Sequence, residues 1–355
     1  MTIYIVYFFL ILLVPALTSV CIKDQRRAQL TALNILMFLM YLILALKGNT
    51  VGNDIEGYRD IYEYTASTEF SDFSYTYMEN GYLLLMKVGN IIGVSFQFFT
   101  AILYVIILVP LYILIKKYSS DVMLSMMILF CLDFFVFACS GLRQAVGMSL
   151  CVAAFLLLKK NDNIKYFILS CVIVVGAAFF HKSALLFLPI LLIIKFRMKT
   201  ITYFSYIVVF AILIYIPQYF ININVEHELS KYHYDDRLTI GLMFAFDVIM
   251  FVFFLFSQSQ KRVDDITKNL NWDLSNILFY GLILAVAFNG SIIMRSSLFE
   301  LLFLSVIMPR AINSWELHTR QFIKYVYISV LFYCLYFLIL KPATLNIVPY
   351  KFFFE

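Results

Sequence analysis

The chain has 355 residues, of which 63% are hydrophobic and 14% are charged. Soluble domains carry about 25% charged and about 45–50% apolar residues, so this composition excludes a soluble globular protein and predicts a polytopic membrane protein. The formal net charge of +5 does not indicate nucleic-acid binding, because the basic residues lie in short clusters between apolar runs, where they orient helices.

Apolar runs long enough to cross the bilayer recur along the whole chain. Crossing about 30 Å of hydrocarbon takes roughly 17–25 residues. The runs lie near residues 3–22, 30–47, 95–115, 122–139, 142–158, 164–180, 183–196, 201–217, 239–257, 273–289, 296–310 and 322–340. They predict an all-α fold in a single membrane domain over residues 1–355, with about 12 spans in a range of roughly 10–14. The runs 183–196 and 296–310 are short, which is typical of tilted or broken helices beside polar cavities.

Basic residues follow every second predicted span, beginning with Lys23, Arg26 and Arg27 after the first. Because Lys and Arg collect in cytoplasmic loops, we expect these loops to be cytoplasmic. The other loops and both termini are then predicted to be external. The two largest external loops are expected at about residues 48–78 and 218–238.

The stretch 79–93 decides this orientation. It carries apolar residues at helical spacing together with Lys87 and Asn90, which predicts an amphipathic helix on the outer surface. The alternative is a true membrane span. That span would invert every later loop and place the basic clusters outside.

Three short polar breaks interrupt the apolar runs on the side predicted to be external. They are Ser140 to Gln144, His181 to Ser183, and Asn289 to Ser297. A charge taken into hydrocarbon costs several kcal/mol unless it is paired or wet. We therefore expect the three breaks to meet and to form a cationic site for an anionic, lipid-linked substrate.

Each break offers one residue for chemistry. Arg143 and Arg295 can donate to phosphate or pyrophosphate oxygens. The alternative for Arg143 is that its side chain reaches the lipid headgroups, and the alternative for Arg295 is an intrahelical pair with Glu300. His181 can serve as a general base or donate to a phosphate oxygen, because imidazole titrates near neutral pH. The alternative is a buried histidine bonded to a carbonyl.

The first external loop adds carboxylates and tyrosines, which suit sugar hydroxyls and sugar ring faces. Asp54 and Glu56 could hold a divalent metal, although a solvated acidic loop explains them equally well. No metal or other cofactor is predicted, and the nucleotide-binding patterns G-x-x-x-x-G-K-[ST] and G-x-G-x-x-G are absent from the sequence. In addition to Arg295, the residues predicted to bind substrate are Ser140, Gln144, Arg59, Glu79 and Tyr82.

Four motifs resemble a known family. They are Val51-Gly52-Asn53-Asp54 with Tyr58 following, Glu79-Asn80-Gly81-Tyr82, Ser140-Gly141-Leu142-Arg143-Gln144 and Phe180-His181-Lys182-Ser183-Ala184. In this order and spacing they resemble the EpsG family, which belongs with the Wzy-type polysaccharide polymerases, over roughly residues 30–310. The family's usual arginine ahead of the first motif is not present here, and Lys47 is the nearest base.

The resemblance implies a polymerase of O-antigen, capsule or exopolysaccharide repeat units, similar to multi-span membrane glycosyltransferases of the GT-C-like class. Its substrate would be an undecaprenyl-diphosphate-linked oligosaccharide at the outer face of a bacterial inner membrane. Arg143 and Arg295 would hold the diphosphate, and His181, Asp54 or Glu79 would take the proton of the attacking hydroxyl. The lipid bilayer is an expected partner, a chain-length regulator protein is a candidate partner, and nucleic acid is not expected.

Two other functions stay open from the sequence. A flippase for the same lipid-linked units would need a similar number of spans, with basic residues at mid-membrane and a pseudo-repeat, neither of which is evident. An O-antigen ligase or an acyltransferase would use the same histidine and arginines on another acceptor. Only the family resemblance separates the polymerase from the ligase.

Overall fold

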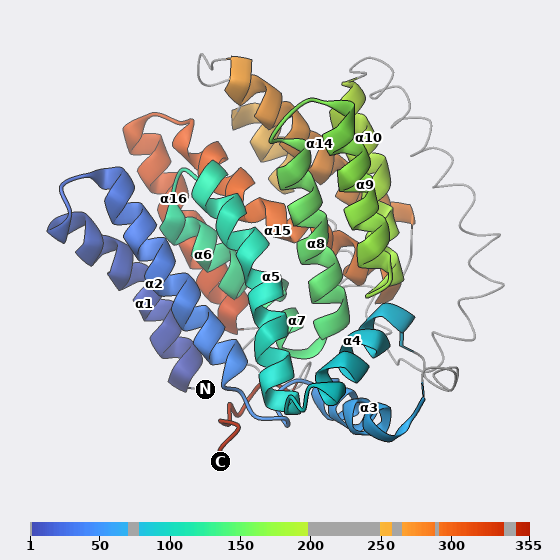
Figure 1. Cartoon of the computed structure of the whole chain (residues 1–355). Helices are drawn as coiled ribbons and strands as arrows, with labels where there is room; N and C mark the ends of the chain where they lie inside the picture. The colour runs from blue at the N-terminus through green and yellow to red at the C-terminus, as the bar shows by residue number, and fades with distance from the viewer. Residues whose placement is uncertain (1, 70–77, 198–248, 258–264, 288–290, 337–345) are drawn as a thin grey trace.

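The fold is all-α, as the sequence predicts (Figure 1). The structure is a computed structural model, and it describes residues 2–69, 78–197, 249–257, 265–287, 291–336 and 346–355. Within these ranges the only pairing of extended backbone is an isolated antiparallel bridge between Lys47 and Phe352.

Three described helices are long and apolar enough to cross a membrane: α1 (Thr2–Cys21), α2 (Gln25–Ala45) and α5 (Phe96–Tyr118). A fourth span results if α6 (Val122–Cys131) and α7 (Asp133–Ser140) are taken together, because they form one apolar segment bent by 49°. These helices establish a membrane protein. The described residues therefore supply three or four clear spans, and the predicted total of about 12 stays a prediction.

Several predicted spans have other lengths in the structure. The remaining helices are α8 (Leu142–Leu158), α9 (Ile164–Ala178), α10 (Leu188–Phe196), α14 (Asp265–Ala287), α15 (Ser291–Asn313) and α16 (Leu317–Leu335). The run 183–196 is broken, as expected: the 3₁₀ helix η2 (Lys182–Phe187) leads into α10, with Pro189 in the first turn, where proline is tolerated. The run 296–310 is not short, because it lies inside the 23-residue α15. The runs 201–217 and most of 239–257, and the loop 218–238, lie outside the described residues.

The stretch expected to be the loop 48–78 contains a helix, α3 (Ile55–Ser67), and the predicted surface helix is α4 (Asn80–Ile91). At 1.5 Å per residue, the 12 residues of α4 extend about 18 Å, which is too short to cross the bilayer. The sequence interpretation treated the tyrosines of this region as exposed. Tyr58 and Tyr62 of α3 are instead buried, because they lie on the helix face that packs against α4.

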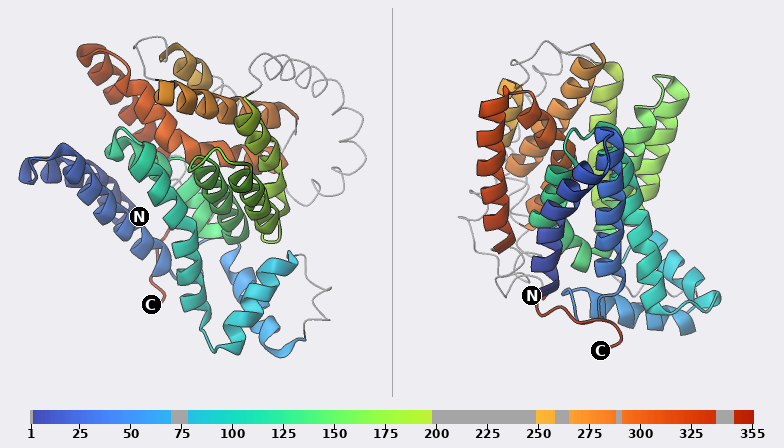
Figure 2. Two further views of the ribbon diagram at one scale, coloured as in Figure 1. Left: turned by 45° about the horizontal axis from the view of Figure 1, so that its top comes forward. Right: turned by 90° about the vertical axis from the view of Figure 1, so that its left-hand side faces the viewer.

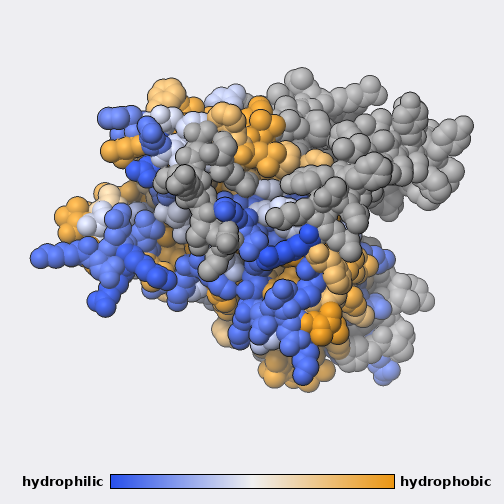
Figure 3. All heavy atoms as spheres, turned by 90° about the horizontal axis from the view of Figure 1, so that it is seen from above, coloured by the Kyte–Doolittle hydropathy of each residue, from blue (hydrophilic) through white to orange (hydrophobic). Residues whose placement is uncertain are grey.

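Helices α3 and α4 lie at one end of the bundle, together with both chain termini (Figures 1 and 2). The turn between α1 and α2, which carries Lys23, Arg26 and Arg27, lies at the other end. Figure 3 looks onto that other end, where hydrophilic side chains gather over the middle of the face. The predicted polar site and the first basic turn thus lie at opposite ends of the molecule.

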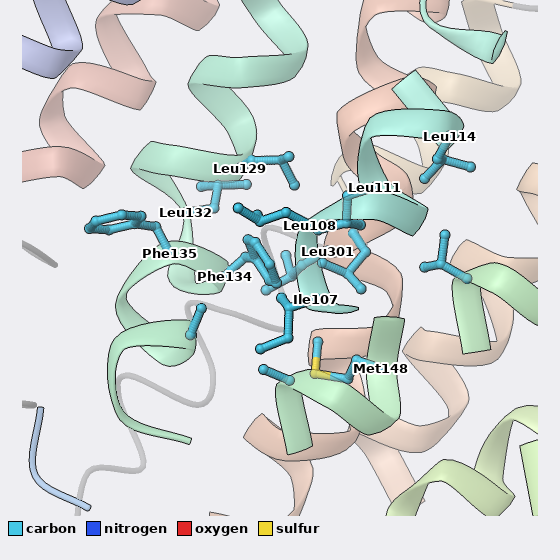
Figure 4. Close-up of a cluster of buried hydrophobic side chains, with 14 of the residues drawn as sticks. Ile107, Leu108, Leu111, Leu114, Leu129, Leu132, Phe134, Phe135, Met148 and Leu301 are labelled. Carbon is cyan, nitrogen blue, oxygen red and sulfur yellow. The ribbon is translucent and has the colours of Figure 1, made fainter. Parts of the chain in front are cut away.

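The core forms around α5, which packs against α2 and α8, and around the contact between α15 and α6. Ile107 and Leu111 of α5 meet Leu129 of α6, Met148 of α8 and Leu301 of α15 in one buried cluster (Figure 4). Lipid tails are as apolar as these side chains, so close van der Waals packing rather than removal from water holds such helices together.

A buried ion pair ties α8 to α14 at the end opposite α3 and α4. Lys159 at the end of α8 lies 2.5 Å from Asp273 of α14, whose side chain is 0% exposed. The other carboxylate oxygen of Asp273 has no hydrogen-bond partner among the described residues. Lys159 is therefore the main compensation for this buried charge.

We predict that Lys159→Met destabilises the fold by about 3–5 kcal/mol, because it leaves the Asp273 carboxylate buried without its cation. The thermal unfolding midpoint of the purified chain in detergent measures the effect. Lys160→Met is the matched control, since Lys160 is exposed. Equal midpoints for the two variants would show that the pair does not stabilise the fold.

Candidate functional site

An ion pair between two of the sequence motifs forms the centre of the site. Arg143 lies in the first turn of α8, and Glu79 immediately precedes α4. Nη1 of Arg143 lies 2.5 Å from Oε2 of Glu79, and their side chains are only 15% and 13% exposed. Charge-assisted hydrogen bonds of this kind are shorter and stronger than neutral ones, so Glu79 fixes the guanidinium in one orientation.

Two tyrosines support the guanidinium from one side. Nε of Arg143 donates to the hydroxyl of Tyr58 at 3.5 Å, and the guanidinium carbon lies 5.8 Å from the centre of the Tyr58 ring. Tyr82 packs against Tyr58 with ring centres 5.7 Å apart and is fully buried. Tyr82 thus supports Tyr58 in this structure, and its predicted role in substrate binding stays a prediction.

Glu79 also connects the site to the second polar break. Its Oε1 accepts a hydrogen bond from the backbone N–H of Lys182 at 3.4 Å. This approach is possible because Gly81 lies directly against the end of α9: a Cβ on Gly81 would lie 2.6 Å from Cβ of Phe179. The glycine thus lets α4 lie against the end of α9, immediately before His181.

His181 is half-buried immediately before η2 and bonds to Ser183. Its Nδ1 lies 2.6 Å from Oγ of Ser183 and accepts from the Ser183 backbone N–H at 3.4 Å. A backbone N–H can only donate, so Nδ1 is the acceptor in the contact with the Ser183 backbone.

The first motif is anchored to the turn between α7 and α8. The backbone N–H of Asp54 donates to Oγ of Ser140 at 3.2 Å. Gly52 has a φ of +105° and lies on the carbonyl of Cys139, where a Cβ would lie 2.3 Å from the oxygen. Asp54 is exposed and its carboxylate does not cap α3. Ser140, which is 2% exposed, therefore anchors the loop, and Asp54 is left at the surface of the site.

Lys47 lies beneath this loop and not among the substrate-facing residues. Its side chain is buried, and its ammonium donates to the carbonyl of Val51 at 2.7 Å. Burial lowers the pKa of Lys47 to about 8, because the charged form loses its hydration. This lysine holds the loop and does not replace the arginine that the family resemblance led us to look for.

The other predicted residues divide into three cases. Arg59 pairs with Glu63 at 2.8 Å on the exposed face of α3, where their side chains are 50% and 60% exposed, so the structure does not bring Arg59 to Arg143. Gln144 is buried, at 3% exposed. Arg295 belongs to α15, which contacts α7, α8 and η2, but its side chain lies outside the described residues. No group of three or more His, Cys, Asp and Glu that could hold a metal ion occurs in the described part of the chain.

The sequence prediction missed two contributors. The first is the contact of Tyr58 with Arg143. Tyr58 follows Asp54 by four residues, which is the spacing of one helical turn, but the sequence analysis treated this stretch as a loop and not as a helix. The C-terminal segment was missed entirely, because no local pattern indicates that the backbone of residues 346–353 bonds to the loop after α2.

We predict that Gly52→Ala destabilises the chain by more than the about 1–2 kcal/mol expected for a positive φ alone, because the new methyl group meets the Cys139 carbonyl. Gly93→Ala is the matched control: its φ is +72°, and a Cβ there meets nothing within 4 Å. Thermal unfolding in detergent compares the two variants. A larger loss for Gly93→Ala would contradict the described position of the loop.

Comparison with known families identifies the family of the chain. A family model described as EpsG family matches residues 30–352, which include the residues of all four motifs. Comparisons with curated proteins and with solved structures gave no significant match. The expected similarity to GT-C-like glycosyltransferases therefore stays a prediction. The EpsG family is a family of Wzy-like polymerases. Because the match covers nearly the whole length, the chain belongs to the EpsG family.

Proposed function

We propose that this protein is a glycosyltransferase that polymerises oligosaccharide repeat units carried on undecaprenyl diphosphate. One observation carries the proposal: the Arg143–Glu79 pair lies at one end of the bundle, next to the break that contains His181 and the loop that contains Asp54. Membership in a family of Wzy-like polymerases supports the same reaction class. In this proposal the enzyme transfers the growing glycan from its lipid diphosphate to the next lipid-linked unit.

Arg143 is our candidate for binding the diphosphate. A guanidinium carries five N–H donors in a plane, so an arginine that is oriented by one carboxylate retains the capacity to donate to a phosphate. Arg143 also lies in the first turn of the 17-residue α8, and the N-terminus of a helix favours anions through its backbone N–H groups and its dipole. Both effects would stabilise the negative charge that develops on the departing diphosphate.

His181 serves in this proposal as a second donor to the diphosphate. When Nδ1 accepts from the Ser183 backbone N–H, the proton of the neutral ring lies on Nε2, from which it could be donated to a phosphate oxygen. Of the two roles that the sequence left open for His181, we therefore propose the donor.

Asp54 is the candidate general base. Both oxygens of Glu79 accept hydrogen bonds, from Arg143 and from Lys182, so proton transfer to Glu79 would disturb the orientation of Arg143, and the other acid of the site, Asp54, is an exposed residue beside the Ser140–Arg143 turn. The acceptor hydroxyl would attack the anomeric carbon and pass its proton to Asp54. The bond from that carbon to the diphosphate oxygen breaks, and the lipid diphosphate leaves. The glycosyl diphosphate bond supplies the energy, so the proposal needs no nucleotide.

The external side of the membrane is our proposed location of the site. Lys23, Arg26 and Arg27 lie at the opposite end of the bundle, and such clusters usually face the cytoplasm. Exposed apolar side chains along α1 and α9 provide a surface for the lipid tails. A lipid-linked substrate could therefore stay in the outer leaflet of a bacterial inner membrane while its sugars reach the site.

We predict that Arg143→Lys and Glu79→Gln each lower polymerisation by about 100-fold, because lysine lacks the planar fork and a neutral amide cannot hold the guanidinium as firmly as a carboxylate. The variants are expressed in a host that lacks its own copy, and its surface polysaccharide is run on a gel. Arg27→Lys is the control, since Arg27 is 82% exposed at the opposite end.

The expected result is a ladder that collapses to a single repeat unit while membrane levels of the protein stay normal. Loss of all surface repeat units, with lipid-linked units building up inside, would indicate a flippase instead. A full ladder in both variants would reject the site.

We predict that His181→Asn retains more activity than His181→Ala, because the asparagine amide still donates a hydrogen bond to the diphosphate. Asp54→Asn should lower kcat by roughly 100-fold or more, because its amide cannot accept the proton. Turnover of extracted lipid-linked repeat units by the purified chain measures all three variants. Equal losses in both His181 variants together with full activity in Asp54→Asn would reject Asp54 as the base and would favour His181 in that role.

A further inference from the structure

The C-terminal segment, residues 346–355, crosses the end of α2 beside the loop that leads to Asp54 (Figures 1 and 2). Three backbone hydrogen bonds join it to that stretch. Gly48 N–H donates to Lys351 O at 2.8 Å, Phe353 N–H donates to Leu46 O at 3.0 Å, and Gly52 N–H donates to Asn346 O at 3.1 Å. The segment therefore binds the loop along its length, although the two lie near opposite ends of the sequence.

Two tyrosines fasten the same segment to the first two helices. The hydroxyl of Tyr4 in α1 donates to Ile347 O at 2.7 Å, and that of Tyr350 donates to Ile43 O of α2 at 2.9 Å. Their rings meet edge to face with centres 5.8 Å apart. The C-terminal segment thus connects α1 and α2 to the loop and is held from both sides.

The loop is enclosed between this segment and the end of α7. Gly52 lies on the Cys139 carbonyl, and Cys139 is 1% exposed. Lys47 itself is 4% exposed and bonds to Val51 O. If the C-terminal segment were lost, the loop would keep its contacts with the end of α7 and the bond from Gln97 of α5 to Lys47 O, but it would lose the three backbone bonds to the segment.

We infer that residues 346–353 are a positioning element of the site: they hold the loop 46–54 against the end of α7, so that Asp54 stays beside the Ser140–Arg143 turn. This inference rests on the proposed function, because it assigns Asp54 a place in catalysis. The C-terminal segment holds the loop, and the loop in turn is bonded to the α7–α8 turn through Asp54 N–H and Ser140 Oγ. A displacement of about 1 Å at such a point can cost about 100-fold in rate.

The test compares two truncations of the full chain. Removing residues 346–355 deletes all five hydrogen bonds that join the segment to the loop and to α1 and α2, whereas removing only Phe354 and Glu355 leaves all of them in place. We expect the long truncation to lower kcat by about 100-fold with little change in KM, since Arg143 and Glu79 lie on other elements. The short truncation should match the intact chain. Gel filtration and thermal unfolding confirm that each chain is folded, so that kcat refers to folded enzyme.

Thiol labelling provides a readout that does not depend on activity. In a variant that keeps Cys139 as its single cysteine, a maleimide reagent should label the long truncation about tenfold faster than the short one, because the loop that lies on Cys139 is no longer held there by the segment. Should the long truncation fail to fold, the double variant Tyr4→Phe/Tyr350→Phe removes only the two hydroxyl contacts and should move both readouts in the same direction.

The outcomes separate the two proposals. If the intact chain has no turnover with extracted lipid-linked repeat units, the proposed function fails, and the labelling still decides whether the segment covers the loop. If the intact chain turns over and the folded long truncation does so equally well, the positioning role is overturned. The same conclusion follows if Cys139 stays equally protected in every chain.

Discussion

The site depends on a buried ion pair at the start of α8. Arg143 could not remain largely buried at the end of an apolar bundle without a partner, because an uncompensated charge there costs several kcal/mol. Glu79 supplies that partner from a different helix, so α4 must lie across the ends of α8 and α9. The glycine at position 81 makes this crossing possible, because it removes the side chain that would meet Phe179. One electrostatic requirement thus determines where a whole surface helix lies.

The same requirement explains why the polar motifs meet although they lie far apart in the sequence. Glu79 bonds to Arg143 and to the backbone before η2, and Tyr58 of α3 supports the guanidinium from the other side. The loop before α3 is in turn anchored to Ser140, three residues before Arg143. The first two motifs thus contact the α7–α8 turn directly, and the motif that contains His181 is joined to it through Glu79.

Composition and the length of the apolar runs predict an all-α membrane protein, because both can be counted directly in the sequence without knowing which residues meet in the fold. The polar breaks identify Arg143 and His181 for a similar reason: a charge in an apolar run needs an explanation. Tyr58 and Tyr62 were misjudged, because tyrosines in a polar loop and tyrosines on the buried face of a short helix have the same composition. The bonds between residues 346–353 and the loop after α2 are made by backbone atoms, so the identities of the side chains do not predict them. From the sequence, Lys47 is only the base nearest to the position of the family's usual arginine, and its burial in the structure shows that it supports the loop.

The pairing of Glu79 also separates the roles of the two acids. In the proposed mechanism, Glu79 could accept a proton from a sugar only by weakening its bonds to Arg143 and Lys182, which would release the arginine that we propose to hold the diphosphate. Asp54 is exposed and lies beside the Ser140–Arg143 turn. Under this proposal one acid positions the arginine and the other takes the proton, so the leaving group is stabilised and the acceptor is activated in the same step. This division of roles requires that Asp54 be held firmly, and the buried side chains of Val51 and Ile55, which lie on either side of it in the sequence, help to hold it.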